Sequence, residues 1–191
     1  GDSTYYRAVN GANAVAVLTA AACVPDVLAV HDARGSVAEF FGFDGDSGAA
    51  AGQLWRVTDA AGNRAYAGHA TSAAAAISSG YSSGRVTDAY DSAGRHYGYT
   101  YAAVSGTVRL TRVEVSAPSS GPLLAAVDYL YALAAIGGGE PHAFADGNLH
   151  EVLVSTAVDP EARPVRWIEA RTHYRYEPGS SRLALVVEPE G

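Results

Sequence analysis

The chain has 191 residues, of which 48% are hydrophobic and 17% charged, a composition that supports a packed core and excludes global disorder. Its formal net charge is −7 and its arginines form no cluster, which argues against nucleic acid and anionic membranes because both select a basic surface. A single cysteine excludes an internal disulfide framework, the lack of a long apolar run excludes membrane insertion, and no signal peptide is recognisable in this chain.

Three segments rich in alanine come in chain order and differ in what they predict. Residues 13–24 and 123–136 fit short helices, and Pro122 would suit the first turn of the second one. Each also carries valines or tyrosines at alternate positions, which fit a strand equally well. Both segments therefore stay open between helix and strand. Residues 73–77, between serine-rich flanks, are predicted to be a loop.

A short turn motif recurs along the chain, in which an acidic residue is followed within a few positions by glycine or arginine. The Asp side chain can accept a hydrogen bond from the backbone two residues on, and Gly tolerates a positive φ. Such a turn joins two antiparallel strands. The copies start at Asp32, Asp59, Asp91, Asp159 and Glu188, at irregular intervals that indicate a degenerate repeat.

The segments between these turns have the alternation of short strands. In residues 96–101 a tyrosine stands at every second position, and residues 107–115 are predicted to carry Val108, Leu110, Val113 and Val115 on one face. Further strands are expected at 53–58, 64–69, 151–155, 165–170, 172–176 and 182–187. The predicted fold class is therefore all-β, built from antiparallel hairpins in a meander.

The domain organisation predicted from the sequence is a single β-rich unit over residues 1–191, which would be one segment of a longer repeat protein. The most linker-like stretch, residues 116–122, is a soft candidate boundary. It reads equally well as an ordinary long turn.

Residues 84–95, with Tyr99 and Tyr101 after them, resemble the tyrosine–aspartate (YD) repeat of RHS proteins, in which a Tyr-Asp pair, a Gly and an Arg mark each unit. Residues 52–64 and 174–183 look like further units. The repeat-turn residues that match are Asp59, Gly62, Arg64, Asp91, Gly94 and Arg95. Two units depart from the pattern, because His31 and Thr58 stand where a Tyr precedes the Asp.

The resemblance implies a β-ribbon that spirals into a hollow shell. In bacterial relatives such a shell commonly encloses a toxic polypeptide for export, and in animal relatives it carries adhesion surfaces. The implied partners are other segments of the same parent protein or an enclosed polypeptide, and the implied location is secreted or at the cell surface. The terminal self-cleavage region of the family is not recognisable here, so no catalytic residue is carried over.

Candidate binding residues of another kind are the aromatic side chains, which could stack on sugar rings or form the packing of the sheet itself. They are Trp55, Tyr97, Tyr99, Tyr101 and Trp167. A carbohydrate-binding β-domain is accordingly the alternative function, with glycans as partners. An all-β hydrolase comes third, with Asp146 and His150 as an acid–base pair.

No metal or other cofactor is expected. Residues 44–48 space two carboxylates like the start of a calcium loop, but they lack the bidentate Glu at its end and are interpreted as a solvated turn. The six histidines show no spacing of zinc ligands.

Overall fold

The computed structural model describes residues 2–7, 15–21, 24–43, 45–68, 73–132, 147–177 and 182–188. The prediction of an all-β fold is confirmed, because these residues form one antiparallel sheet of 13 strands with a separate two-stranded hairpin and little helix. Neighbouring strands of the large sheet follow one another along the chain, in the order β1 to β6 and then β9 to β15. The chain divides into two compact units, residues 1–97 and 98–191.

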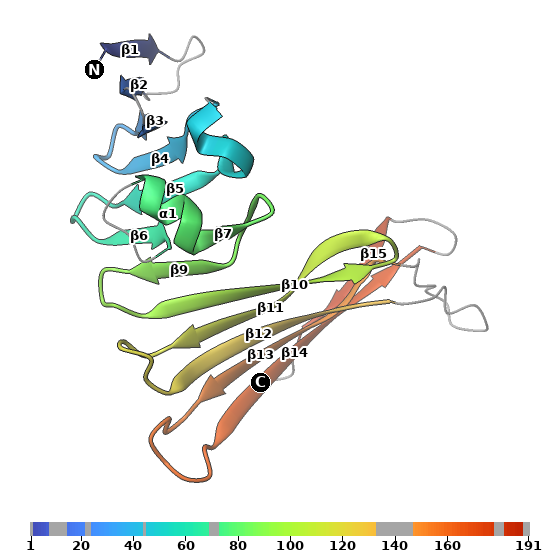
Figure 1. Ribbon diagram of the computed structural model, residues 1–191. Coiled ribbons are helices and arrows are strands. Elements are labelled where there is room, and N and C mark those ends of the chain that lie inside the picture. Colours follow the sequence, from blue (N-terminus) through green and yellow to red (C-terminus); the bar gives the residue numbers. More distant parts are fainter. Residues whose placement is uncertain are drawn as a thin grey trace. The chain divides into compact units, whose positions relative to one another are not determined.

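The first unit contains most of the short strands and both helical segments (Figure 1). Its strands in the large sheet are β1 (Asp2–Arg7), β2 (Val15–Ala21), β3 (Val24–His31), β4 (Val37–Phe41), β5 (Leu54–Thr58), β6 (Arg64–Ala67) and β9 (Asp88–Asp91). The hairpin of β7 (Tyr81–Ser82) and β8 (Arg85–Val86), the 3-10 helix η1 (Gly45–Ala50) and the helix α1 (Ala73–Gly80) lie between them. Strand β10 (His96–Val104) begins in this unit and continues in the next.

The core of the first unit is small and aromatic. Phe41 stacks on Trp55 with ring centroids 6.1 Å apart and meets the edge of Tyr81 at 5.5 Å. Ala50 of η1 and Ala76 of α1 complete this cluster of buried side chains. The two helical segments thus supply the second layer that covers one side of the short strands in this unit.

The prediction of a loop at residues 73–77 is wrong, because they form the first part of α1. A run of alanines is a strong helix former, and the serine-rich flank at its end does not stop it. Two of its residues, Ala76 and Ile77, pack against the Phe41–Trp55 cluster, so tertiary burial adds to the local propensity.

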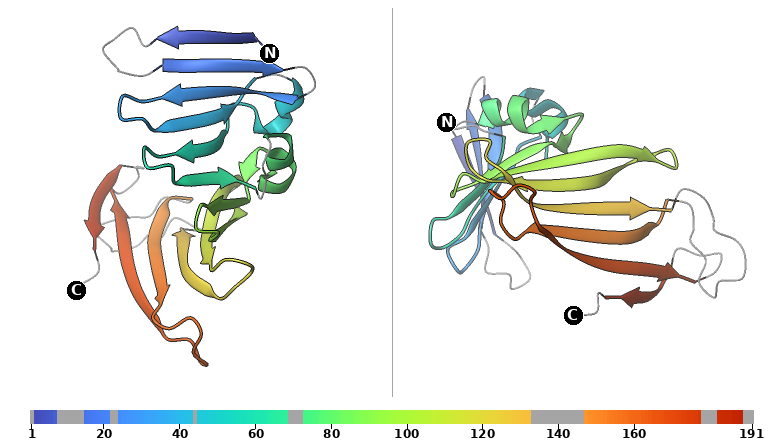
Figure 2. Two further views of the ribbon diagram at one scale, coloured as in Figure 1. Left: turned by 90° about the vertical axis from the view of Figure 1, so that its left-hand side faces the viewer. Right: turned by 90° about the horizontal axis from the view of Figure 1, so that it is seen from below.

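The second unit consists of strands and turns in its described residues (Figure 1). After β10 come β11 (Thr107–Ser116), β12 (Leu123–Tyr131), β13 (Leu149–Ala157), β14 (Trp167–Tyr176) and β15 (Leu183–Val187). Figure 2 shows β11 to β14 as one curved layer of long strands. No helix among the described residues of the whole chain is long and apolar enough to cross a membrane.

The two ambiguous segments are strands wherever the structure describes them. Residues 15–21 form β2 between β1 and β3, and residues 123–131 form β12 between β11 and β13. Pairing on both sides favours the alternating valines and tyrosines over the helical tendency of alanine. The rest of both segments, apart from Val24 in β3 and Ala132 after β12, lies outside the described residues. Residues 117–122 are the turn that leads from β11, which ends at Ser116, into β12, while the two units divide at Tyr97 and Gly98.

Candidate functional site

Three of the predicted repeat turns have the same geometry and join β3 to β4, β5 to β6 and β9 to β10 (Figure 1). In each, Asp Oδ1 accepts hydrogen bonds from the backbone N–H groups two and four residues later, at 2.8–3.0 Å. The Gly three residues after the Asp has a φ of 87°, 88° and 79° in turn. The expected hydrogen bond from the backbone N–H two residues after the Asp is therefore confirmed. These turns start at Asp32, Asp59 and Asp91.

The turn at Asp91 has the most contacts. Arg95 donates from Nε to Oδ2 of Asp91 at 2.6 Å, and the Tyr97 hydroxyl donates to the same oxygen at 3.1 Å. Next to this turn, His96 and Asp88 lie 2.8 Å apart, and the His96 ring lies 4.8 Å from that of Tyr90. The Asp91 carboxylate thus connects the turn to β10, the strand that follows it.

The Asp59 turn uses a different side chain at the same place. Asn63 Nδ2 donates to Oδ2 of Asp59 at 2.8 Å, as Arg95 does to Asp91. Arg64 was expected to be the arginine of this repeat, but it is the first residue of β6, where its backbone pairs with Thr58. The residue four positions after the Asp is the one whose side chain reaches the carboxylate, and Arg64 stands one position too late.

Hydrogen bonding to the ionised form lowers the pKa of all three carboxyls. For Asp32 the main cause is the backbone N–H of Ser36, and for Asp59 it is the Asn63 side chain. Desolvation raises the pKa of Asp91, but the hydrogen bonds from Arg95 and Tyr97 outweigh it and the net shift is downward. Each turn is therefore more stable with its Asp charged.

The fourth copy, at Asp159, departs from this geometry. Its Oδ1 accepts one backbone hydrogen bond, from Glu161 at 3.2 Å, and no glycine follows. Arg163 instead donates to backbone carbonyls of the same turn, of which Ala162 is nearest at 2.8 Å. The match to 174–183 contains residues 178–181, which lie outside the described residues together with most of the fifth copy.

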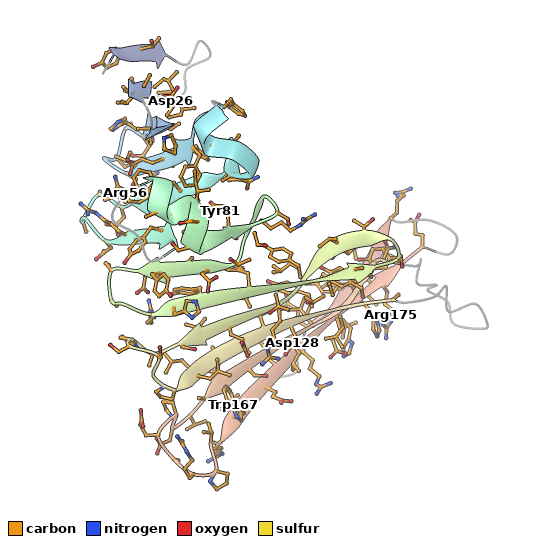
Figure 3. The ribbon with its side chains drawn as sticks, in the orientation of Figure 1. Asp26, Arg56, Tyr81, Asp128, Trp167 and Arg175 are labelled. Carbon is orange, nitrogen blue, oxygen red and sulfur yellow. The ribbon has the colours of Figure 1, made fainter. Side chains whose placement is uncertain are left out.

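Trp55 does not present an aromatic face to solvent. Only 8% of it is exposed, because it packs between Phe41 and the guanidinium of Arg56, which lies 4.6 Å from the ring centroid. Arg56, labelled in Figure 3, is fixed in turn by a two-pronged ion pair with Glu39 on the neighbouring strand β4. Of the two roles that the sequence left open for Trp55, the structure has packing: Trp55 belongs to the core of the first unit.

The other aromatic candidates are half-buried. Tyr97, Tyr99 and Tyr101 stand at alternate positions of β10, so the expected strand placement is present. The hydroxyl of Tyr97 is held by Asp91 inside the turn. Trp167 begins β14 and pairs with Ala157, away from the tyrosines of β10 in the strand order (Figure 3). Within the second unit, three strands separate Trp167 on β14 from Tyr99 and Tyr101 on β10.

The predicted solvated turn at residues 44–48 is also corrected where it is described. Residues 45–48 belong to η1, and the Ser47 side chain is fully buried. The reason is that η1 contributes to the covering layer of the first unit, as Ala50 shows. Asp44 and Asp146 lie outside the described residues, so the pairing of Asp146 with His150 stays a prediction. Among the described residues no group of three His, Cys, Asp or Glu is placed to hold a metal ion.

The second unit has a sheet whose two faces differ chemically, a property that follows from the strand register. Residues paired directly across an antiparallel ladder lie on one face. One face, here called the apolar face, carries Val113, Val115, Ala125, Val127, Tyr129, Val152, Val154, Thr156, Ile168, Ala170 and Thr172. The other, the charged face, carries Arg112, Glu114, Ala126, Asp128, Leu130, Glu151, Leu153, Ser155, Glu169, Arg171 and His173.

This register corrects the orientation predicted for β11. Arg112 and Val113 point to opposite faces, so regular alternation places Val108 and Leu110 on the charged face with Arg112. Only Val113 and Val115 belong to the apolar face. The strand was predicted correctly, but its valines and leucine do not share one side.

Ion pairs run across the charged face from strand to strand. Arg112 donates from Nη1 to both carboxylate oxygens of its partner Asp128, at 2.7 and 2.9 Å. Two strands further, the largely buried carboxylate of Glu151 lies 3.3 Å from Arg171 and 3.3 Å from His173. These pairs stabilise the layer by matching opposite charges on neighbouring strands.

A β-bulge turns His150 toward this cluster. Leu130 pairs with Glu151 while Tyr131 pairs with Leu149, so His150 is the extra residue. Its ring centroid lies 6.1 Å from that of His173, and burial, followed by the charge of Arg175, lowers the pKa of His150. The partners Glu151, Arg171 and His173 were not predicted from the sequence, because only the register of β13 against β14 brings them together.

No protein-family model matches this chain, and a search of curated proteins finds no match.

Proposed function

We propose that this chain is a structural segment of an RHS-type β-shell, whose ribbon encloses or displays another polypeptide. The observation that carries the proposal is the recurrence of one turn geometry at residues 32–36, 59–63 and 91–95 in a sheet whose strand order follows the chain order. Five of the six repeat-turn residues of the resemblance to YD repeats lie in these turns: Asp59, Gly62, Asp91, Gly94 and Arg95; the sixth, Arg64, begins β6.

A ribbon of this kind suits a wall. Each hairpin pairs only with its neighbours, so the sheet can be lengthened one unit at a time, as in other repeat architectures. The described residues of the second unit form a single layer with one charged and one apolar face, which gives a wall two chemically distinct sides. A secreted or cell-surface location and delivery of a toxic polypeptide are parts of the same proposal.

The two alternatives have less support. Glycan binding was based on five aromatic side chains, of which Trp55 is in the core and Tyr97 is bound within its turn. In the second unit, Trp167 is separated by three strands from Tyr99 and Tyr101, so these three do not form one platform. A hydrolase was based on His150 and Asp146. Two residues near His150, Glu151 and His173, form ion pairs with Arg171 or with each other that support the sheet.

The proposal is tested on the complete product of the gene that contains this chain. We expect electron microscopy of the purified product to show a hollow β-walled particle, and limited proteolysis to leave an internal polypeptide intact until the wall is unfolded by urea. A product in which this region forms a separate domain, with no enclosed volume and no second polypeptide on its surface, would overturn the proposal.

A matched pair of variants tests the link to the repeat turns. Replacing both Asp59 and Asp91 by Ala removes two complete turn networks, whereas Asp159→Ala removes one hydrogen bond of 3.2 Å. The double variant is expected to expose the internal polypeptide to protease at lower urea concentration than the single variant. Equal protection in both variants would contradict the role assigned to these turns.

A further inference from the structure

Two histidines of the charged face lie close to one another and to an arginine. His150, the extra residue of the bulge in β13, has its ring centroid 6.1 Å from that of His173 on β14. Arg175 stands two positions after His173 on the same side of β14, and its charge acts on His150. His150 is half-buried, so water screens these charges only in part.

The carboxylate next to these histidines is already shared. Glu151 is 8% exposed and lies 3.3 Å from Arg171 and 3.3 Å from His173. Among the described residues, Arg175 and His173 disfavour a proton on His150, whereas Glu151 favours it. A proton on His150 would therefore add a positive charge beside two other basic groups, next to one carboxylate that two partners already contact.

The other charged groups on the neighbouring strands of this face have partners of their own. They form the ion pairs Arg112–Asp128, Arg112–Glu114 and Arg171–Glu169. On β15 the residues Leu183–Val187 carry no charge, and the Tyr176 hydroxyl donates a hydrogen bond to the backbone carbonyl of Leu149. The acidic groups of these strands are therefore already in contact with arginines.

This arrangement has a defined consequence for stability. Burial, followed by the charge of Arg175, lowers the pKa of His150 from the ordinary value of 6.5. When β13 separates from β14, His150 enters water and binds a proton more readily than in the closed sheet. The closed sheet is therefore favoured most above pH 6.5, and this advantage is lost as the pH falls through the folded pKa of His150.

We propose that His150, with His173 and Arg175 beside it, is an acid-sensitive element that loosens the pairing of β13 with β14 when the solution is acidified. The proton is taken up in the open form, in which His150 is in water. The aspartate turns of the first unit respond only below the ordinary carboxyl value of 3.8, so the second unit opens first. The inference does not depend on the shell function, because it concerns the stability of one sheet.

Hydrogen exchange of the 191-residue chain, measured by mass spectrometry at about pH 7.5 and about pH 5.5 and corrected for intrinsic rates, tests the proposal. We expect the protection of amides in β13 and β14 to fall about twofold to tenfold, because one proton changes the open population at most about tenfold per pH unit. Amides of β4 and β5 in the first unit are the internal reference and should keep their protection.

Three variants separate His150 from general effects of acid. His150→Gln removes the titrating ring and should abolish the pH difference in β13 and β14. The matched control is His31→Gln, at an exposed histidine of β3 in the first unit, which should leave the difference unchanged. Arg175→Gln should reduce the difference, because loss of its positive charge raises the pKa of His150 toward the ordinary value.

The proposal is overturned if the parent chain keeps its protection in β13 and β14, if His150→Gln shows the same fall, or if β4 and β5 lose protection equally. Circular dichroism at about pH 7.5 shows whether each variant folds. If His150→Gln does not fold, the NMR titration of His150 in the parent chain decides. A midpoint below 6.5 supports the proposal, and a midpoint at or above 6.5 overturns it.

Discussion

The guanidinium of Arg95 lies 2.6 Å from the carboxylate of Asp91 across a single hairpin turn. The same carboxylate accepts hydrogen bonds from two backbone N–H groups and from the Tyr97 hydroxyl. Asp91 is thus the hub of the turn between β9 and β10. These partners lie within six positions of Asp91 along the chain, so the contacts of the turn are local.

Replacing Asp91 by Ala is expected to lower the free energy of unfolding by about 1–2 kcal/mol, because several hydrogen bonds of the turn lose their acceptor at once. Asp91→Asn keeps one acceptor oxygen for the backbone and should lose less. Urea unfolding followed by circular dichroism measures both. A larger loss for Asn than for Ala would show that the backbone hydrogen bonds are not the main contribution.

Stability should fall with acidification in a definite direction. The pKa values of Asp32, Asp59 and Asp91 are lowered in the folded chain from the ordinary value of 3.8. A depressed folded pKa stabilises the fold above the unfolded pKa, and this contribution disappears as the pH falls through the folded value. We therefore expect the urea concentration at the unfolding midpoint to decrease when the pH is lowered below about 4. The decrease should be smaller in a variant with all three aspartates changed to Asn. An identical pH dependence of both proteins would contradict this assignment.

Gly62 has a φ of 88°, and a Cβ added there would meet nothing within 4 Å. Gly62→Ala should therefore cost about 1 kcal/mol of stability through backbone strain alone. Asn tolerates this conformation better than Ala, so Gly62→Asn should be less destabilising. Thermal unfolding of the two variants checks the order, and the reverse order would mean that the strain is not set by φ.

Strand β15 is the last strand of the described sheet, and all five of its residues, Leu183–Val187, are exposed and uncharged. Unprotected edges of this kind promote association between sheets. Val186→Lys should raise the concentration at which the chain aggregates, as measured by light scattering at increasing concentration. Ala61→Lys adds the same charge at an exposed turn and should have a smaller effect. Equal effects would assign the change to net charge and not to the edge.

The sequence by itself determined many of the strands and three of the repeat turns, because both depend on local chemistry. Asp59 accepts its hydrogen bonds within the turn, and Gly62 supplies the positive φ that the same turn requires. The spacing of these two residues is therefore enough to predict the geometry. Alternation at residues 96–101 likewise predicts a strand without knowledge of its neighbours.

Only the tertiary structure decided which face each strand presents and which residues meet. Trp55 became a core residue because η1 and α1 cover its side of the sheet. His150 joined Glu151 and His173 because one extra residue shifts the register of β13 against β12. A shift of one position moves a side chain to the other face of a sheet, and the sequence of a single strand does not contain the register of its partner.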